Sequence, residues 1–556
     1  MESINLDPQD LFNFKNELRK SVKILTNLNL YNSAKWSAEA LNDDDIINSI
    51  LENDKIALAK SYFDCKEFDR CSNCLKDCKS SIALFIKLYS TYLSGEKRKE
   101  EDSEGVLGQQ DSIAQNLSLP LILKEIELYI NNHEDTSKNL NPFLYYLYGI
   151  ILLKQKNIKQ AQESFFKSLL LYPYNWTCWA ELIASISSFD EALNFLNKFL
   201  NLKPNSINSE FGKQIKLDNK NIMIKVFSVV IHQEFFQQNI ILLKELNFLT
   251  KLFPNFSFIK IQKALISYHH LDYQDSEKIF DDILLNDPFR LDDLDIYSNI
   301  LYVMEKNSKL LYLAQLASSV DKFRPETCCI IANYYSLKFE HEKAIMYYRR
   351  ALTLNRECLA AWTLMGHEFV ELKNSHAAIE SYRRAVDTNN KDFKAWYGLG
   401  QAYEVLDMHL YSLYYYQKAC SLNPLDKRMW QALGNCYEKL NKYNESIKCY
   451  KRALAISDMD PIILYKLALL YQELKDIHSC VSYMKLCLKE EEEYEPTDET
   501  CKARLWLAKH EFKNCNWEDA YRYASELNNG SSNEIEEARS IAREAMNAIK
   551  TKQFSR

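Results

Sequence analysis

The chain has 556 residues, 47% of them apolar, and a formal net charge of -7, so it is long enough for several domains or one extended repeat array. Only 10 residues are glycine, where average usage would give roughly 40, which disfavours phosphate-binding loops and tight hairpins. The acidic balance argues against binding of nucleic acid by a basic surface.

The N-terminal sequence MESINLDPQD carries acidic residues and no apolar core, so we expect no signal peptide. The longest apolar run, Phe143 to Leu153, is too short to span a bilayer, and no membrane partner is expected. The 15 cysteines are therefore expected to be reduced thiols in the nucleus and cytoplasm.

Residues 1–93 are expected to form degenerate, repeat-like helices. Small and large apolar residues recur there at helical spacing, first as half a unit and then as a full one: Ala34, Ala38 and Leu41, followed by Leu58, Ala59, Tyr62, Cys71, Leu75 and Cys78. Residues 94–118 begin with SGEKRKEEDSEG, are charged and contain few large apolar residues. This composition predicts a disordered loop.

Residues 119–200 predict further helix pairs of the same kind. Tyr145 and Trp179 occupy equivalent places 34 residues apart, and Pro173 ends the first pair. The next equivalent residue is Val226, later than this step requires. We therefore expect an insertion at residues 201–221.

From residue 222 to 488 one pattern recurs every 34 residues. With Trp396 as position 4 of its unit, positions 4, 7, 8 and 11 form one stripe of a first helix, and positions 20, 24 and 27 form one stripe of a second. Small residues at positions 8, 20 and 27 allow the helices to approach, and proline at position 32 ends a unit. The anchors at position 4 are Val226, Lys260, Leu294, Cys328, Trp362, Trp396, Trp430 and Leu464.

A helix pair with this period and pattern is the tetratricopeptide repeat. The sequence thus predicts an all-α tetratricopeptide repeat solenoid, a right-handed superhelix of antiparallel helix pairs. An acidic loop is expected at residues 489–500, followed at residues 501–556 by a C-terminal helical pair and a capping helix.

Four cysteines, Cys65, Cys71, Cys74 and Cys78, are close enough in sequence to suggest zinc. However, Cys71 and Cys78 fall on positions 20 and 27, where a small buried residue is needed, and Cys480 and Cys487 occupy the same positions of another unit. Cysteine is then a small apolar residue of the core. We expect no metal and no cofactor.

No catalytic constellation is found in the sequence: GxSxG, HExxH and phosphate-binding loops are all missing. The tyrosines and tryptophans fall mostly on core positions rather than on a surface that stacks bases. The chain is therefore expected to be neither an enzyme nor a nucleic acid-binding protein.

The first helix of each unit is expected to line a concave groove, through positions 2, 5, 9 and 12. Amides and carboxylates lie at or near these positions. Such a lining suits an extended peptide that carries arginine, although a plain solvated face would have a similar composition. The residues concerned are Asn333, His367, Glu368, Glu371, Gln401, Glu404, Asn435 and Glu438.

Two other kinds of repeat protein were weighed. Co-chaperones of this class bind acidic tails through lysine or arginine, notably at position 5. Here position 5 has no basic residue, which disfavours a co-chaperone without excluding another peptide-binding adaptor; it is occupied by Cys329, Thr363, Tyr397 and Gln431. A glycosyltransferase fused to the array would need a catalytic domain, for which the repeats leave no room.

Several strings go beyond a generic repeat. RPETCCIIANYYSLKFEHEKAIMYYRRALTLN, AAWTLMGHEFVELKNSHAAIESYRRAVD and KAWYGLGQAYEVLDMHLYSLYYYQKA closely resemble the family of subunit eight of the anaphase-promoting complex, or cyclosome. SAKWSAEAL, LAKSYFDCKEFDRC, YLSGEKRKEED and DPFRLDDLDIYSNILYV resemble the same family. The resemblance extends from about residue 12 to 525.

This resemblance implies a non-catalytic scaffold subunit of a ubiquitin ligase that marks mitotic regulators. It implies a homodimer formed through the N-terminal repeats, and contacts with other tetratricopeptide repeat subunits and the large platform subunit. It also implies that the C-terminal groove binds the C-box of an activator, a short motif that contains arginine. The family's C-box contacts match Asn333 and Glu368, and we extend the predicted site to Glu371, Tyr397, Gln401 and Glu404.

Two substitutions follow from this assignment. Glu368→Lys is expected to abolish activator binding and to leave the fold intact, because a surface charge change costs little stability. Gly400→Trp is expected to damage the fold, because position 8 has no room for the ring.

Overall fold

The computed structural model describes residues 8–42, 52–78, 80–102, 116–134, 138–201, 208–209, 221–237, 240–456, 460–491, 497–527 and 530–554. The chain forms two compact units, residues 1–262 and 263–556. The division falls within helix α13 (Ser257–His269), and thus inside the array predicted for residues 222–488.

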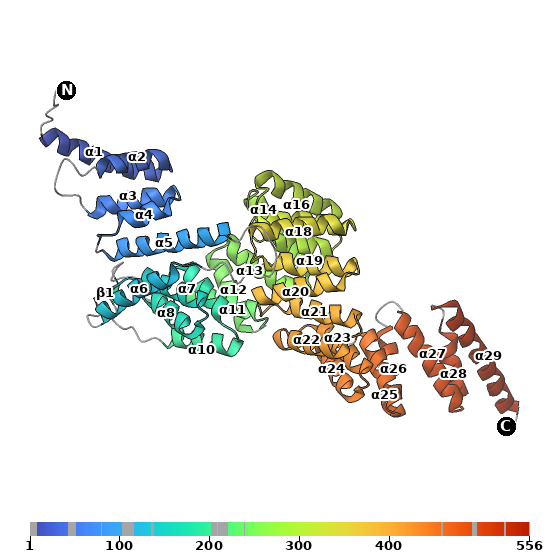
Figure 1. Cartoon of the computed structure of the whole chain (residues 1–556). Helices are drawn as coiled ribbons and strands as arrows, with labels where there is room; N and C mark the ends of the chain where they lie inside the picture. Colours follow the sequence, from blue (N-terminus) through green and yellow to red (C-terminus); the bar gives the residue numbers. More distant parts are fainter. Residues whose placement is uncertain are drawn as a thin grey trace. The chain divides into compact units, whose positions relative to one another are not determined.

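The first unit consists of helices that follow one another in chain order (Figure 1). Its one exception among the described residues is a pair of very short parallel strands, β1 (Lys138–Leu140) and β2 (Asn208–Ser209). The helices are α1 (Pro8–Asn27), α2 (Tyr31–Leu41), α3 (Glu52–Asp64), α4 (Phe68–Cys74), α5 (Ser81–Asp102), α6 (Leu119–Glu134), α7 (Pro142–Lys154), α8 (Ile158–Leu171), α9 (Trp176–Ser185), α10 (Phe189–Leu200), α11 (Ile222–Glu234) and α12 (Ile240–Leu252).

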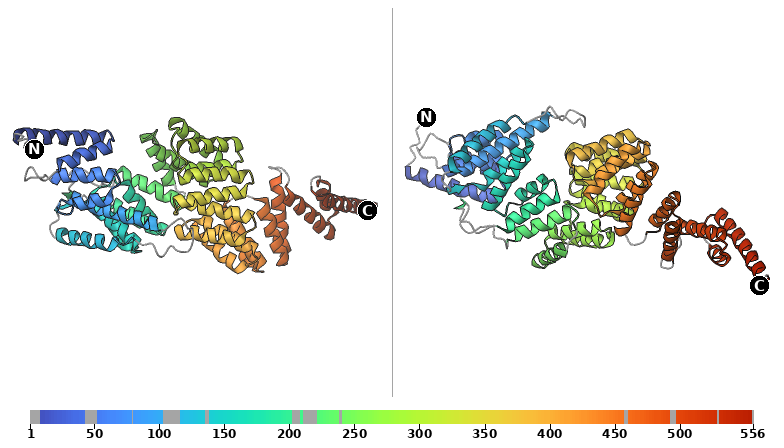
Figure 2. Two further views of the ribbon diagram at one scale, coloured as in Figure 1. Left: turned by 45° about the horizontal axis from the view of Figure 1, so that its top comes forward. Right: turned by 90° about the horizontal axis from the view of Figure 1, so that it is seen from below.

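The second unit continues the alternation of helix pairs (Figure 2). Its helices are α14 (Tyr273–Asn286), α15 (Leu294–Val303), α16 (Asn307–Val320), α17 (Pro325–Leu337), α18 (His341–Leu354), α19 (Leu359–Glu371), α20 (Ser375–Thr388), α21 (Phe393–Val405), α22 (His409–Leu422), α23 (Lys427–Lys439), α24 (Tyr443–Ile456), α25 (Pro461–Glu473), α26 (Ile477–Glu491), α27 (Asp498–Lys513), α28 (Trp517–Ser525) and α29 (Ser532–Phe554).

In the seven helix pairs from α13–α14 to α25–α26, the turn repeats as regularly as the sequence. It passes through a residue with positive φ, a backbone that costs an L-residue about 1–2 kcal/mol. Backbone hydrogen bonds of the Schellman type offset this cost; in one turn Asn374 N donates to Phe369 O at 2.8 Å. The turn residues, 34 residues apart, are Leu271, Glu305, Phe339, Lys373, Asp407, Asn441 and Lys475.

Positions 8 and 24 pack directly against one another in the pairs that have glycine at position 8, as the sequence predicts. The buried ring of Tyr416 lies against Gly400, and Tyr382 and Tyr450 lie in the same way against Gly366 and Gly434. Tryptophan at position 4 forms a hydrogen bond between successive units. Its indole N–H donates to the backbone carbonyl of position 32 in the preceding unit. The pairs are Trp179 with Pro173, Trp362 with Arg356, Trp396 with Asn390, and Trp430 with Pro424, at 2.7–3.0 Å.

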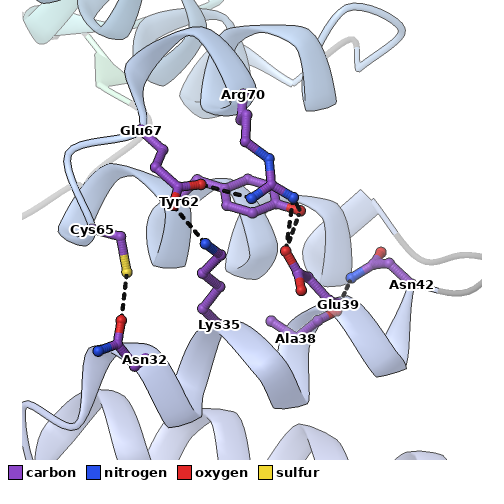
Figure 3. Close-up of polar contacts among 9 residues, drawn as sticks. All are labelled: Asn32, Lys35, Ala38, Glu39, Asn42, Tyr62, Cys65, Glu67 and Arg70. Atoms are coloured by element: carbon purple, nitrogen blue, oxygen red, sulfur yellow. Dashed lines mark hydrogen bonds and ion pairs between the residues drawn. The ribbon is translucent and has the colours of Figure 1, made fainter.

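The degenerate N-terminal repeat is confirmed as helical, with α2 packed on α3 and α4. Arg70 bridges Glu67 and Glu39 and lies over the ring of Tyr62, and Lys35 pairs with the same Glu67 at 2.5 Å (Figure 3). Lys35 and Glu39 are one turn apart and therefore lie on the same face of α2. This face contacts Glu67 and Arg70 of the same unit.

The predicted core role is confirmed for Cys71, Cys480 and Cys487, whereas Cys78 lies beyond the end of α4 and is only partly buried. Cys71 is buried among Ala38, Leu58 and Tyr62, and burial raises its pKa to about 11. Cys480 and Cys487 are buried between α25, α26 and α27. All 15 cysteines are free thiols, and no group of three or more metal-ligating side chains is found within the described residues.

The predicted loop boundaries need correction at both charged segments. Residues 94–102 of the loop predicted at 94–118 are helical, because Ser94 and Arg98 bond to Asp69 of α4 and so extend α5. Residues 103–115 lie outside the described part.

At the acidic loop predicted for 489–500, helix α26 extends to Glu491, and α27 begins at Asp498 with Thr497 as its N-cap. The insertion predicted at 201–221 contains β2, and its other residues between 202 and 220 lie outside the described part.

Candidate functional site

The six predicted site residues lie on the first helices of three successive repeats, α17, α19 and α21. The structure brings three of them together: Glu371, Gln401 and Glu404 line one cavity of about 270 Å³ between α19 and α21. His367, Val370 and Val405 complete its lining. Asn333, Glu368 and Tyr397 lie outside this lining.

Asn333 is buried, with 2% of its surface exposed, and its amide is satisfied inside the protein. Its Nδ2 donates to Ser298 Oγ and to Asn299 Oδ1, both at 2.7 Å, and its Oδ1 accepts from the hydroxyl of Tyr348. A peptide can therefore use Asn333 only by sharing or replacing these bonds.

Glu368 is also buried, with 4% of its surface exposed, so the expectation that it is a surface residue is wrong. Its Oε1 accepts from Ser336 Oγ at 2.6 Å, and its Oε2 lies 2.7 Å from His341 Nδ1. Position 10 faces the neighbouring helices α17 and α18 here rather than open solvent. A lysine at position 368 would bury an ammonium group beside His341.

Tyr397, Gln401 and Glu404 form one stripe of α21. The Tyr397 ring lies 5.5 Å from the ring of Tyr416, and burial raises the pKa of Tyr397. Glu404 Oε2 accepts from the Tyr416 hydroxyl at 2.7 Å, and Lys439 Nζ lies 3.5 Å from its Oε1. The carboxylate of Glu404 is thereby oriented by two side chains while it lines the cavity.

The cavity has a negative lining at neutral pH. Burial, together with the nearby Lys394, lowers the pKa of His367 to about 4, so its imidazole is uncharged. Its Nδ1 lies 2.8 Å from the hydroxyl of Tyr382. The charges of Glu371 and Glu404 are then not offset by His367. Two carboxylates and an amide in one cavity suit a guanidinium group, which binds carboxylates through paired hydrogen bonds.

The periodic pattern did not predict the partners that fix these groups. Tyrosine at position 24 was predicted only as core. In three units its hydroxyl also reaches position 9, in the pairs Tyr348–Asn333, Tyr382–His367 and Tyr450–Asn435. The recurrence of tyrosine rather than phenylalanine at position 24 was the available signal, because a buried hydroxyl needs a partner.

This fold and this lining define a class: the chain is a tetratricopeptide repeat protein with a cavity between two of its first helices that is lined by carboxylates and an amide. None of the helices in the described part of the chain is long and apolar enough to cross a membrane.

Comparisons with known proteins specify the family. The family model "Anaphase promoting complex subunit 8 / Cdc23" matches residues 43–264, and tetratricopeptide repeat models match residues 325–358, 366–406, 434–475 and 462–494. The chain is 45% identical to the anaphase-promoting complex subunit CDC23 of Saccharomyces cerevisiae, over 97% of this chain and 99% of that protein. It is 40% identical to the anaphase-promoting complex subunit 8 of Arabidopsis thaliana, over 59% of this chain and 52% of that protein.

The fold also resembles a solved structure, the APC/C hetero-tetramer Cut9–Hcn1, with a TM-score of 0.60, 15% identity and coverage of 96% of both chains. That likeness shows the fold alone. The full-length sequence match is decisive: the chain belongs to the anaphase-promoting complex subunit 8/Cdc23 family.

Proposed function

We propose that this chain is a non-catalytic scaffold subunit of the anaphase-promoting complex, a ubiquitin ligase, and that it binds the arginine-containing C-box of an activator. The single observation that carries the peptide site is the cavity between α19 and α21, lined by Glu371, Gln401 and Glu404. Binding there supports ubiquitination of mitotic regulators by placing the activator on the ligase. The complex is then assembled with other repeat subunits and the platform subunit, in the nucleus and cytoplasm.

The chemistry of the cavity favours arginine over other side chains. Glu371 is exposed at the end of α19. Glu404, on α21, accepts a hydrogen bond from Tyr416. A guanidinium can therefore contact two carboxylates that belong to different helices. A hydrogen bond to a charged group contributes about 1.5–3 kcal/mol. The same lining repels the acidic tails that co-chaperones bind, and this disfavours the co-chaperone alternative.

The peptide site is tested by fluorescence anisotropy of a labelled C-box peptide with the purified full-length chain. We expect saturable binding that Glu371→Gln and Glu404→Gln each weaken about tenfold or more, because each removes a charge-assisted bond. Glu380→Gln is the matched control, since Glu380 is exposed on the second helix α20 and pairs with Arg384. Equal affinity of all four proteins would show that the peptide does not use this cavity.

We further propose that the chain forms a homodimer through its N-terminal repeats. Ile24, Leu28 and Trp36, on and just beyond α1 and on α2, are exposed large apolar residues, and Trp36 is 66% exposed. Lys35, the neighbour of Trp36 on α2, pairs with Glu67 inside the unit. Ile24 and Leu28 are one turn apart, and an apolar surface that extends over several side chains is typical of protein interfaces.

Trp36→Asp is expected to convert the dimer into a monomer, because it replaces an exposed apolar side chain of the proposed interface with a charge. The molar mass of the full-length protein in solution, measured by light scattering after gel filtration, checks this. Lys76→Asp, an exposed change in the turn that follows α4, should leave the mass at that of the dimer. A Trp36→Asp protein that remains dimeric would place the interface elsewhere.

A further inference from the structure

Gly398 is the only glycine at position 6 of the repeat, a position that the periodic pattern leaves open. It lies in the middle of α21, where glycine is less favourable than alanine. A glycine in a helix interior points to a close approach by a neighbouring element. In the eight units anchored from Val226 to Leu464, position 6 is occupied by Ser228, Gln262, Ile296, Ile330, Leu364, Gly398, Ala432 and Lys466.

The neighbour that approaches is the ring of Tyr382, on helix α20 of the preceding repeat. A Cβ atom at position 398 would lie 2.5 Å from Cε1 of this ring. Van der Waals contact between two carbon atoms needs about 3.5–4.0 Å. A Cβ atom at Gly366, on α19, would also lie 2.5 Å from the same ring atom. One ring therefore lies against two glycines, one on α19 and one on α21.

A second unit shows that position 6 faces the tyrosine of the preceding repeat. On α25, Lys466 occupies position 6, and its Nζ lies 5.9 Å from the centre of the Tyr450 ring. Tyr450 is the residue at position 24 of the preceding unit, as Tyr382 is for Gly398. Because Gly398 has no side chain, the backbone of α21 itself reaches the ring.

The ring of Tyr382 has little freedom to move away. Its side chain is fully buried, and its hydroxyl lies 2.8 Å from His367 Nδ1. It packs in one core cluster with Leu399 and Ala402 of α21. A methyl group at position 398 would therefore displace α21 rather than the ring, by about 1 Å if normal carbon contacts are to be restored.

The face of α21 that contains Gly398 also lines the candidate peptide cavity. Gly398, Gln401 and Val405 follow one another at spacings of three and four residues, so they share one face of the helix. Gln401 and Val405 line the cavity from α21, and His367 lines it from α19. Because Tyr382 contacts both Gly398 and His367, its ring connects the two walls of the cavity.

We propose that Gly398 is a positioning residue for the peptide site. Together with the ring of Tyr382 it fixes the separation of α19 and α21, so that one guanidinium contacts Glu371 and Glu404 at the same time. This inference rests on the proposed peptide-binding function and adds the element that sets its spacing. Binding groups must be held to within about 0.5 Å, so a displacement of about 1 Å separates the guanidinium from one of the two carboxylates.

The test compares a labelled C-box peptide with the same peptide in which citrulline, the uncharged analogue, replaces arginine. Fluorescence anisotropy with the full-length chain gives the ratio of the two dissociation constants, which does not depend on the folded fraction of the preparation. We expect the wild-type chain to prefer the arginine peptide about a hundredfold, because two charge-assisted contacts are lost with citrulline. Gly398→Ala should reduce this preference to about tenfold, because one contact remains.

Gly434→Ala is the matched control. It adds the same methyl group against a tyrosine ring, 2.9 Å from Tyr450, on helix α23, which contributes no residue to the cavity lining. This variant should lose stability and keep the wild-type preference for arginine. An equal loss of preference in Gly434→Ala and Gly398→Ala would overturn the positioning role, because the effect would then follow from stability alone.

The double variant Gly398→Ala/Tyr382→Leu provides the rescue. Leucine lacks the ring atoms that the methyl group would meet, so the preference for arginine is expected to return to most of its wild-type value. The double variant also decides the question if Gly398→Ala alone does not fold. A folded double variant that fails to regain the preference contradicts the proposal.

The outcomes separate the positioning role from the function on which it rests. A hundredfold preference that survives in folded Gly398→Ala overturns the role of Gly398 while the arginine site stands. If the folded wild-type chain binds the arginine and citrulline peptides equally, the proposed arginine site itself fails.

Discussion

Gly400→Ala is expected to lower the free energy of unfolding by about 1–3 kcal/mol, the usual cost of overpacking a core. A Cβ atom at position 400 would lie 2.4 Å from the ring of Tyr416, which is buried and bonded to Glu404 and so has little freedom to move. Gly400→Trp, which adds a whole ring at the same point, is expected to prevent the α21–α22 pair from forming. Urea unfolding followed by circular dichroism measures both effects.

Gly434→Ala provides the comparison within the same protein. Its Cβ atom would lie 2.9 Å from the ring of Tyr450, so the strain is smaller and a smaller loss of stability is expected. Alanine already occupies position 8 in two other units, as Ala332 and Ala468, where the helix pair accommodates it. Gly400→Ala with wild-type stability would mean that Tyr416 moves aside freely, contrary to its packing.

Glu368→Lys is expected to lose both peptide binding and stability, whereas the sequence predicted a loss of binding with the fold intact. The substitution removes the acceptor of Ser336 and places an ammonium group beside His341 in a buried position. A buried charge that is left without a partner typically costs about 3–5 kcal/mol. Peptide anisotropy and urea unfolding on the same preparations separate the two losses.

Glu371→Lys is the matched variant, one turn further along α19 and exposed. It is expected to weaken peptide binding about as strongly while the free energy of unfolding stays within about 0.5 kcal/mol of wild type. If Glu368→Lys proved as stable as Glu371→Lys, the buried network of Ser336 and His341 would contribute nothing to the fold.

The periodic part of the fold could be predicted from the sequence because each repeat is a local unit. Glycine at position 8 and tyrosine at position 24 meet within one helix pair, as Gly400 and Tyr416 do, and the turn at Asp407 recurs at the same period. The helical spacing also placed Gln401 and Glu404 at positions 9 and 12 of one helix and Glu371 near such positions of another, and the structure brings these three into one cavity.

The burial of Asn333 and Glu368 was decided by contacts between repeats. A helical stripe shows which face of a helix a residue occupies, but neighbouring units determine whether that face is covered, as Ser298 covers Asn333 and His341 covers Glu368.

The contact between Tyr268 and Lys394 depends on the tertiary structure even more strongly. It joins residues 126 positions apart, because the small rotation from each repeat to the next accumulates until α13 and α21 meet. The sequence by itself thus determined the repeat, its core and the family, since these depend on local spacing. Only the tertiary structure decided which polar residues are buried and which charges lie side by side, since these depend on the rotation between repeats.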